Sequence, residues 1–150
     1  MRLWHKDLIP VLPRQQLLGQ WRECCAIAKN IAVNGTPNHL LVNKVLEYPP
    51  EHFATYTGKV FARLVDYEYN CNLDSFMKYT STAEENTFWQ AWWDPVKVKP
   101  GHKVSDAQLF RGWHTYRYLR QCYYNLQEKY DCGGITEEEW QRIESVIAIK

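Results

Sequence analysis

The sequence lacks the features that mark membrane-spanning and secreted proteins. No apolar run in its 150 residues approaches the roughly 18 residues that a spanning helix needs, so no contact with a membrane is expected. The N-terminus also lacks the basic stretch, apolar stretch and small-residue cleavage site that make up a secretory signal. We therefore expect a cytoplasmic protein.

The cysteines indicate neither a disulfide framework nor a metal site. Their number is odd, Cys24 and Cys25 are adjacent, and no CxxC or cysteine–histidine ligand spacing occurs. We interpret all of them as reduced thiols, and we expect no metal and no cofactor. The five cysteines are Cys24, Cys25, Cys71, Cys122 and Cys132.

An excess of one charge is also missing. The formal net charge is +1, so any affinity for nucleic acid would have to come from a local basic patch. With 45% hydrophobic and 23% charged residues, the composition is that of a folded globular protein. A chain of this length buries one substantial core more easily than two, and we predict a single domain over residues 1–150.

Apolar residues recur at helical spacing in three long segments, and no strand signal of comparable strength occurs. The three predicted helices cover residues 13–32, 52–69 and 105–130. Pro13 suits a first helical turn, Ser105 is the predicted cap of the third helix, and Gly133-Gly134 ends it.

Two shorter helices are expected where threonine and glutamate are spaced as capping boxes. These pairs are Thr82 with Glu85, at the start of a predicted helix over residues 82–93, and Thr136 with Glu139, before the C-terminal segment of Trp140, Ile143 and Ile147. The overall prediction is an all-α fold: a single compact domain of three long helices plus shorter helices, with an extended N-terminal segment packed between them.

The first predicted helix carries a polar face around a glycine. Gln15, Gly19 and Arg22 lie above one another on a helix, with Glu23 about 100° further round. Glycine costs about 1 kcal/mol in a helix interior relative to alanine, and one use of it is to let a ligand approach the backbone. From these residues alone, a solvated face of an amphipathic helix is the simpler interpretation.

The first part of the chain also contains two sequence motifs. It begins Met1-Arg2-Leu3-Trp4, and residues 15–23 read Gln-x-Leu-x-x-x-aromatic-Arg-Glu. These motifs resemble the pyrimidine-dimer DNA glycosylases, including the phage-type endonuclease V enzymes, and are similar to a bacterial branch of that family. The resemblance is most specific over residues 1–30, and residues 52–63 are similar to the family's middle helix. Roughly half of the chain is covered.

The resemblance implies a DNA repair enzyme that is both a glycosylase and an AP lyase. The α-amine of Met1 would attack C1′ of the sugar and form a Schiff base, and Glu23 would be the catalytic carboxylate. An α-amine titrates near about 8 and lysine near about 10.4, so far more of the α-amine is uncharged at neutral pH. A carboxylate can stabilise the positive charge at the sugar and remove the C2′ proton for β-elimination.

The resemblance also implies which residues bind damaged double-stranded DNA, with the protein expected to act as a monomer. Arg2 and Arg22 would contact phosphates, which the planar guanidinium suits, and Gln15 would lie in the DNA groove. Apart from the resemblance, the third predicted helix carries cations and aromatic side chains off its buried seam, among which Arg117 and Arg120 are candidate DNA-binding residues, although core or rim packing is the simpler interpretation of the aromatic side chains. That patch consists of Arg111, His114, Arg117, Tyr118, Arg120, Gln121 and Tyr124.

Two departures from the phage enzymes lower the expected DNA affinity. Ala26 stands where those enzymes carry an arginine, and Gln16 stands where they have a histidine. The bulky Arg2 normally leaves Met1 in place, which makes the Met1 amine the expected nucleophile. A damaged pyrimidine other than a dimer, or a bare abasic site, is an alternative substrate.

Other interpretations of the same residues stay open. His5 and His52 are candidates for positioning the sugar or moving a proton, although a surface histidine is the simpler interpretation of His5. One alternative function is a non-catalytic helical module that binds nucleic acid or another partner on the same scaffold. Another is a metal-dependent enzyme using His5, Asp7 and Glu23.

Overall fold

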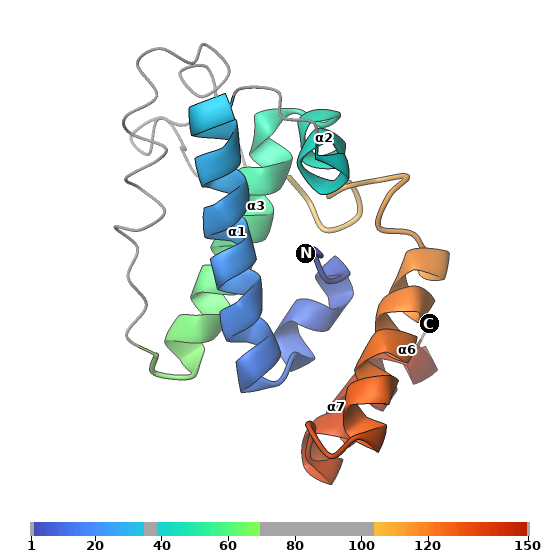
Figure 1. Ribbon diagram of the computed structural model, residues 1–150. Coiled ribbons are helices and arrows are strands. Elements are labelled where there is room, and N and C mark those ends of the chain that lie inside the picture. The colour runs from blue at the N-terminus through green and yellow to red at the C-terminus, as the bar shows by residue number, and fades with distance from the viewer. Residues whose placement is uncertain (1, 35–38, 70–103, 150) are drawn as a thin grey trace.

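The computed structural model describes residues 2–34, 39–69 and 104–149, and every regular element in these ranges is a helix. This confirms the predicted all-α class (Figure 1). None of the helices in the described ranges is both long and apolar enough to cross a membrane. The elements are the 3-10 helix η1 (Lys6–Val11), α1 (Arg14–Asn34), α2 (Leu40–Leu46), α3 (Pro50–Asp66), α6 (Tyr116–Asp131) and α7 (Glu137–Ile149).

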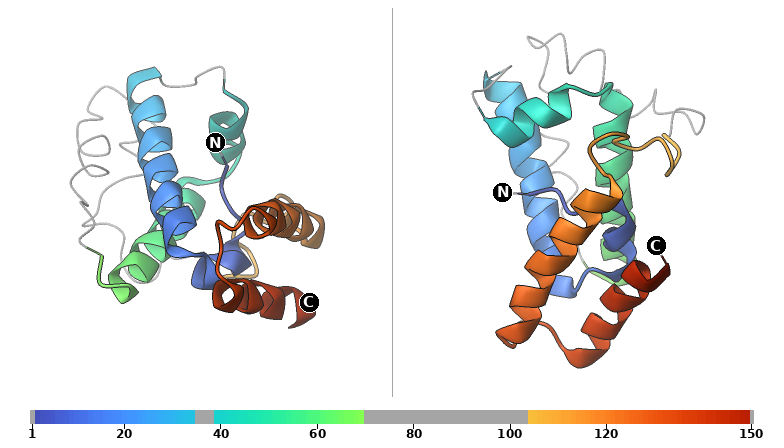
Figure 2. Two further views of the ribbon diagram at one scale, coloured as in Figure 1. Left: turned by 60° about the horizontal axis from the view of Figure 1, so that its bottom comes forward. Right: turned by 90° about the vertical axis from the view of Figure 1, so that its right-hand side faces the viewer.

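The N-terminal segment packs among the helices, as predicted. α1 packs against α3 and α2, α6 packs against α7, and η1 contacts both α3 and α7. The segment that leads into η1 therefore runs between the α1–α3 pair and the α6–α7 pair (Figure 1, Figure 2). Leu3, Leu8 and Leu12 of this part of the chain are fully buried, so it forms the centre of the core.

Only the first few residues of that segment are extended, which corrects the expectation of an extended segment up to the first long helix. Residues 6–11 form η1, because the Nδ1 of His5 accepts a hydrogen bond from the Asp7 N–H at 3.1 Å and caps the turn. The His5 carbonyl accepts from the Leu8 N–H at 2.9 Å. η1 buries Leu8 and Ile9.

The first two long helices agree closely with the sequence. In α1 the predicted apolar stripe is buried, and the Pro13 carbonyl accepts the first helical hydrogen bond from Leu17 at 2.9 Å. α3 begins two residues before the predicted start because Pro50 occupies its first turn, where a missing N–H costs nothing. It ends at Asp66, and Glu68 has a positive φ of 58°.

The third long helix begins at Tyr116, so the prediction of a helix from residue 105 was wrong. Residues 106–113 form turns, with positive φ at Phe110 (50°) and Gly112 (89°). Tertiary contacts hold this turn segment: the Phe110 N–H donates to His52 Nδ1, the Tyr48 hydroxyl donates to the Arg111 carbonyl, and Lys59 pairs with Asp106. These contacts outweigh the helical periodicity, and Thr115 caps α6 instead of Ser105.

The capping box before α7 is confirmed. The Thr136 N–H donates to Glu139 Oε1 at 3.0 Å, and the Glu139 N–H donates to Thr136 Oγ1 at 3.2 Å. The predicted helix over residues 82–93 lies outside the described residues.

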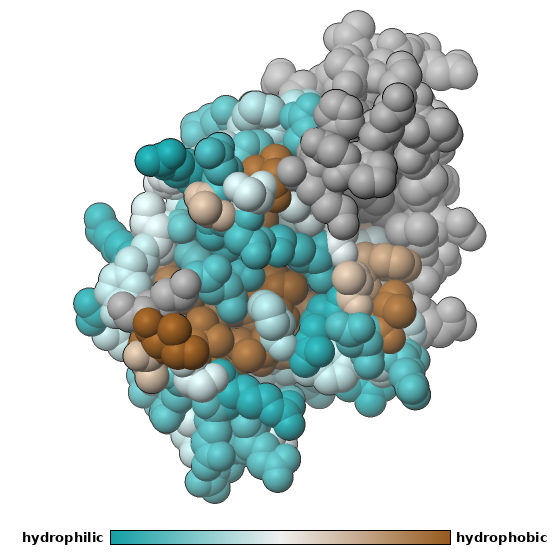
Figure 3. All heavy atoms as spheres, turned by 180° about the vertical axis from the view of Figure 1, so that it is seen from behind, coloured by the Kyte–Doolittle hydropathy of each residue, from teal (hydrophilic) through white to brown (hydrophobic). Residues whose placement is uncertain are grey.

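Seen from behind, the surface is largely hydrophilic, with a band of hydrophobic side chains across its lower half (Figure 3).

Candidate active site

Gln20 of α1 holds the N-terminal segment in one register. Its Oε1 accepts from the Trp4 N–H at 2.7 Å, and its Nε2 donates to the Arg2 carbonyl at 3.0 Å. The side-chain amide thus binds a carbonyl and an N–H two residues apart in an extended segment, as the backbone of a neighbouring strand does in a β-sheet. Gln20 is 1% exposed. No role for Gln20 was predicted from the sequence, although a polar residue within an apolar stripe was the available signal.

Two tyrosines bind the next carbonyls of the same segment. The Tyr56 hydroxyl donates to the Trp4 carbonyl at 2.6 Å and lies 3.1 Å from Gln20 Oε1. The Tyr118 hydroxyl of α6 donates to the Leu3 carbonyl. Burial raises the pKa of both tyrosines well above the usual value, so both hydroxyls keep their protons at neutral pH.

His5 is buried, so the interpretation as a surface histidine was wrong. Its Nε2–H donates to the His114 carbonyl at 3.0 Å while its Nδ1 accepts from Asp7, and this pair of bonds defines a neutral tautomer. His114 is also buried, and its Nδ1 accepts from the Lys6 N–H at 3.0 Å. Burial, together with the neighbouring His5 and Lys6, lowers the pKa of His114 to about 2. The two histidines therefore join the N-terminal segment to the chain that leads into α6.

Glu23 lies about one turn beyond Gln20 on α1, roughly 60° round the helix axis and about 4.5 Å along it. The side chain is half-buried, and its Oε2 is buried without a hydrogen-bond partner in the described part of the chain. None of the ion pairs between described residues involves Glu23. A carboxylate oxygen without a partner is costly to bury, which makes it a candidate for binding a ligand.

Two further buried polar atoms, one on α1 and one on the segment bound to it, have no hydrogen-bond partner among the described residues. They are Nη1 of Arg2, which is next to the carbonyl bound by Gln20, and Oε1 of Gln16. Gln16 and Glu23 fall within about 20° of each other round α1. One helix flank and the segment bound to it thus carry three of the polar atoms that are buried without partners: a cation, a carboxylate and an amide oxygen.

Gly19 leaves open space on the same flank of α1. Apart from its two chain neighbours and the adjacent backbone of α1 itself, no described heavy atom lies within 4 Å of the position that a Cβ would take there. The glycine is therefore not explained by helix packing within the described residues. Open space about 40° round the helix from Glu23 suits the approach of a ligand.

The outer face of α1 is positively charged. Arg22 and Gln15 are both exposed, as their predicted contacts with DNA require. Glu23 is the only acidic residue in α1, while Arg14, Arg22 and Lys29 are basic. This face provides the local basic patch that a chain of net charge +1 needs in order to bind DNA.

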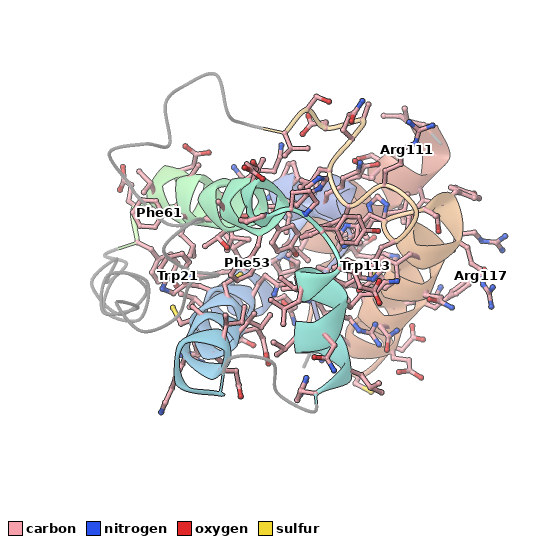
Figure 4. All side chains as sticks on the ribbon, turned by 90° about the horizontal axis from the view of Figure 1, so that it is seen from above. Trp21, Phe53, Phe61, Arg111, Trp113 and Arg117 are labelled. Carbon is pink, nitrogen blue, oxygen red and sulfur yellow. The ribbon has the colours of Figure 1, made fainter. Side chains whose placement is uncertain are left out.

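The predicted patch on the third helix is narrower than the sequence indicated. Arg117 projects outward, and Arg120 lies over the rings of Tyr116 and Tyr124 and donates to the Tyr124 hydroxyl at 2.9 Å (Figure 4). His114 and Tyr118, which the sequence grouped with them, turn inward.

The structure does not bring this α6 patch together with Glu23. Tyr118 faces the N-terminal segment, and Arg120, two residues further on, is about 160° away round the helix. Residues 111–127 nevertheless contain three arginines and no acidic residue, so the exposed side of α6 forms a second, separate basic surface. Arg111 and Arg117 mark its outer edge in Figure 4.

His52 has structural contacts of its own. Its Nδ1 accepts from the Phe110 N–H at 3.0 Å, and its ring packs against Tyr48 and Phe110. Burial lowers its pKa. These contacts anchor the turn segment before α6, and none of them reaches Glu23.

Met1, the predicted nucleophile, lies outside the described residues. Arg2, to which it is bonded, is held through its carbonyl by Gln20. Cys24, Cys122 and Cys132 are free, in agreement with their interpretation as thiols, and Cys71 lies outside the described residues. Across the described ranges, no group of three or more histidine, cysteine, aspartate or glutamate residues could hold a metal ion.

Comparison with known proteins gave one match. The model of the family described as pyrimidine dimer DNA glycosylase matches residues 1–77, just over half of the 150 residues. Neither the curated proteins nor the solved structures contain a match. The matched region includes η1, α1, α2 and α3, and with them Gln15, Gln20 and Glu23, whereas α6 and α7 lie outside it.

Proposed function

Because the chain belongs to the pyrimidine dimer DNA glycosylase family, we propose that it excises damaged pyrimidines from duplex DNA and then nicks the strand. The α-amine of Met1 is the proposed nucleophile, and Glu23 is the proposed catalytic carboxylate. The observation that carries this assignment is the unpartnered, buried Oε2 of Glu23, one helical turn from the side chain that binds Arg2.

In the proposed reaction, the damaged nucleotide leaves the base stack so that C1′ becomes accessible. The uncharged amine attacks C1′, the N-glycosidic bond breaks, and the base departs with the bonding electron pair. One proton of the amine passes to the departing base. The nitrogen lone pair then breaks the C1′–O4′ bond, O4′ takes up a proton from solvent, and a protonated Schiff base forms. Glu23 then takes the proton from C2′, and the 3′ phosphate leaves by β-elimination. The carboxylate also stabilises the positive charge of the preceding intermediates.

Binding of DNA is assigned to the basic face of α1. Arg22 and Gln15 are exposed there, and Arg2, in the segment bound to α1, has a buried guanidinium nitrogen without a hydrogen-bond partner among the described residues. The open space at Gly19 leaves room for a nucleotide beside Glu23. Arg117 and Arg120 are proposed to contact phosphates further from the lesion, because α6 presents them on another side of the molecule.

Trapping with borohydride tests the proposed nucleophile. Untagged protein is incubated with duplex DNA containing an abasic site and sodium borohydride, and a covalent protein–DNA band is expected. Acetylating the α-amine, or adding one residue before Met1, is expected to abolish the band. Full cleavage by the extended protein would contradict the mechanism. Resistance to EDTA is expected, and loss of activity in EDTA would favour a metal-dependent enzyme instead.

The role of Glu23 is tested separately with Glu23→Gln. This variant is expected to bind abasic-site DNA as tightly as the unmodified protein while strand cleavage stops. Glu138→Gln is the matched control, because Glu138 is an exposed glutamate of α7. Cleavage by Glu23→Gln at the normal rate would exclude the assignment. Ultraviolet-irradiated and oxidised DNA, compared side by side, identify the preferred lesion.

A further inference from the structure

The Gln20 carboxamide occupies a position that ordinary helix packing would give to an apolar side chain. It is 1% exposed in the middle of the apolar stripe of α1, and both of its polar groups bind backbone atoms of the N-terminal segment. We propose that Gln20 is a positioning residue for the reaction, holding the α-amine of Met1 in reach of Glu23. This inference rests on the proposed function.

Four backbone groups at the start of the N-terminal segment are bound by side chains of the helices. Gln20 binds the Arg2 carbonyl and the Trp4 N–H. Tyr118 binds the Leu3 carbonyl, and Tyr56 binds the Trp4 carbonyl. Gln20 binds two of these four groups, and it holds the one nearest the terminus. The register of Arg2 on α1 therefore depends on Gln20 more than on Tyr56 or Tyr118.

The helix that carries Gln20 also carries the proposed catalytic carboxylate. Gln20 and Glu23 are three residues apart on α1, a rigid separation of about 4.5 Å along the axis. The residue bonded to Arg2 has its Cα about 3.8 Å from the Cα of Arg2. α1 thus fixes the position of Glu23 directly. Through the hydrogen bond of Gln20 to the Arg2 carbonyl, it also fixes the position of the residue to which Met1 is bonded. Misplacement of a reacting group by about 1 Å can cost roughly 100-fold in rate.

The first test replaces the carboxamide with an apolar side chain of similar length. Gln20→Met is expected to slow single-turnover trapping on abasic-site DNA by about 10- to 100-fold. Its affinity for the same DNA, measured without borohydride, is expected to stay unchanged because Gln20 is too buried to touch DNA. Ile143→Val, a core substitution in α7, is the control for general destabilisation and is expected to trap at the normal rate.

The second test is a pH profile, which a purely structural role would not change. In Gln20→Glu, a protonated carboxyl can still accept from Trp4 and donate to the Arg2 carbonyl, as the amide does. Once ionised, it has no donor for that carbonyl, and its negative charge also favours the protonated form of a nearby amine. The ratio of its trapping rate to that of unmodified protein is therefore expected to fall as pH rises, with circular dichroism showing a folded protein throughout.

The outcomes separate the two proposals. If unmodified protein traps DNA while Gln20→Met traps equally fast, the proposed function stands and the positioning role is overturned. The role is also overturned if Ile143→Val slows trapping as much as Gln20→Met, or if the rate ratio for Gln20→Glu does not change with pH. Failure of unmodified protein to trap any DNA overturns the proposed function and this inference together.

Discussion

The buried His114 makes the stability of the fold depend on pH. Its pKa is about 2 in the folded chain and 6.5 in the unfolded one, because burial disfavours the imidazolium. Between pH 7 and pH 5 the unfolded chain takes up a proton at this side chain and the folded chain does not. The contribution of neutral His114 to the free energy of unfolding is therefore fully present above about pH 6.5 and is lost as the pH falls below that value. From these two pKa values, acidification to pH 5 lowers the free energy of unfolding by about 2 kcal/mol.

Urea unfolding at pH 7 and pH 5 measures this loss. For a chain of 150 residues the corresponding drop in melting temperature is roughly 4–8 °C. In His114→Gln the side-chain amide can still accept from the Lys6 N–H but cannot take up a proton in this range. The variant is expected to lose about 2 kcal/mol less than the unmodified protein between the two pH values. His52, whose pKa burial also lowers, contributes with the same sign in both proteins. Equal losses in both would refute the reasoning.

Three further predictions concern single side chains. Tyr56→Phe leaves the Trp4 carbonyl without its hydroxyl partner. It should lower the free energy of unfolding, measured by urea unfolding, by about 1–3 kcal/mol, and a loss within error of zero would contradict this. Gly112→Ala should destabilise the fold by about 1–2 kcal/mol because φ at this position is +89°. Gly19→Ala, in open space within a helix, should stabilise the fold by about 1 kcal/mol. Melting temperatures that shift in the same direction in both variants would contradict this pair of predictions. Arg117→Ala and Arg120→Ala should each reduce the slope of log K against log salt for DNA binding by about 0.9, and an unchanged slope would show that neither contacts a phosphate.

The long helices could be predicted because their signals are local. The apolar stripe of α1 and the threonine–glutamate pair before α7 each depend on residues a few positions apart, and both are present in the structure. The start of α6 could not be predicted in this way. Apolar spacing continues through residues 105–115, but contacts with His52, Tyr48 and Lys59, far away in sequence, hold that stretch as turns.

The candidate site was predicted only in part, for the same reason. The position of Glu23 on a polar flank follows from helical periodicity, and its lack of an ion pair with any described residue agrees with the assignment. The burial of His5 depends on His114, which is 109 residues away. No spacing rule relates such partners. Gln20 was visible as a polar residue within an apolar stripe, but its two backbone partners become apparent only when the N-terminal segment is seen folded against α1.

The contacts of Tyr118 and His114 with Leu3, His5 and Lys6 affect the order in which the molecule can be completed during synthesis. Translation releases the beginning of a chain first. The surroundings of the first few residues, however, include side chains from the last third of the polypeptide. During translation, the N-terminal segment therefore lacks its contacts with His114 and Tyr118 until α6 has left the ribosome.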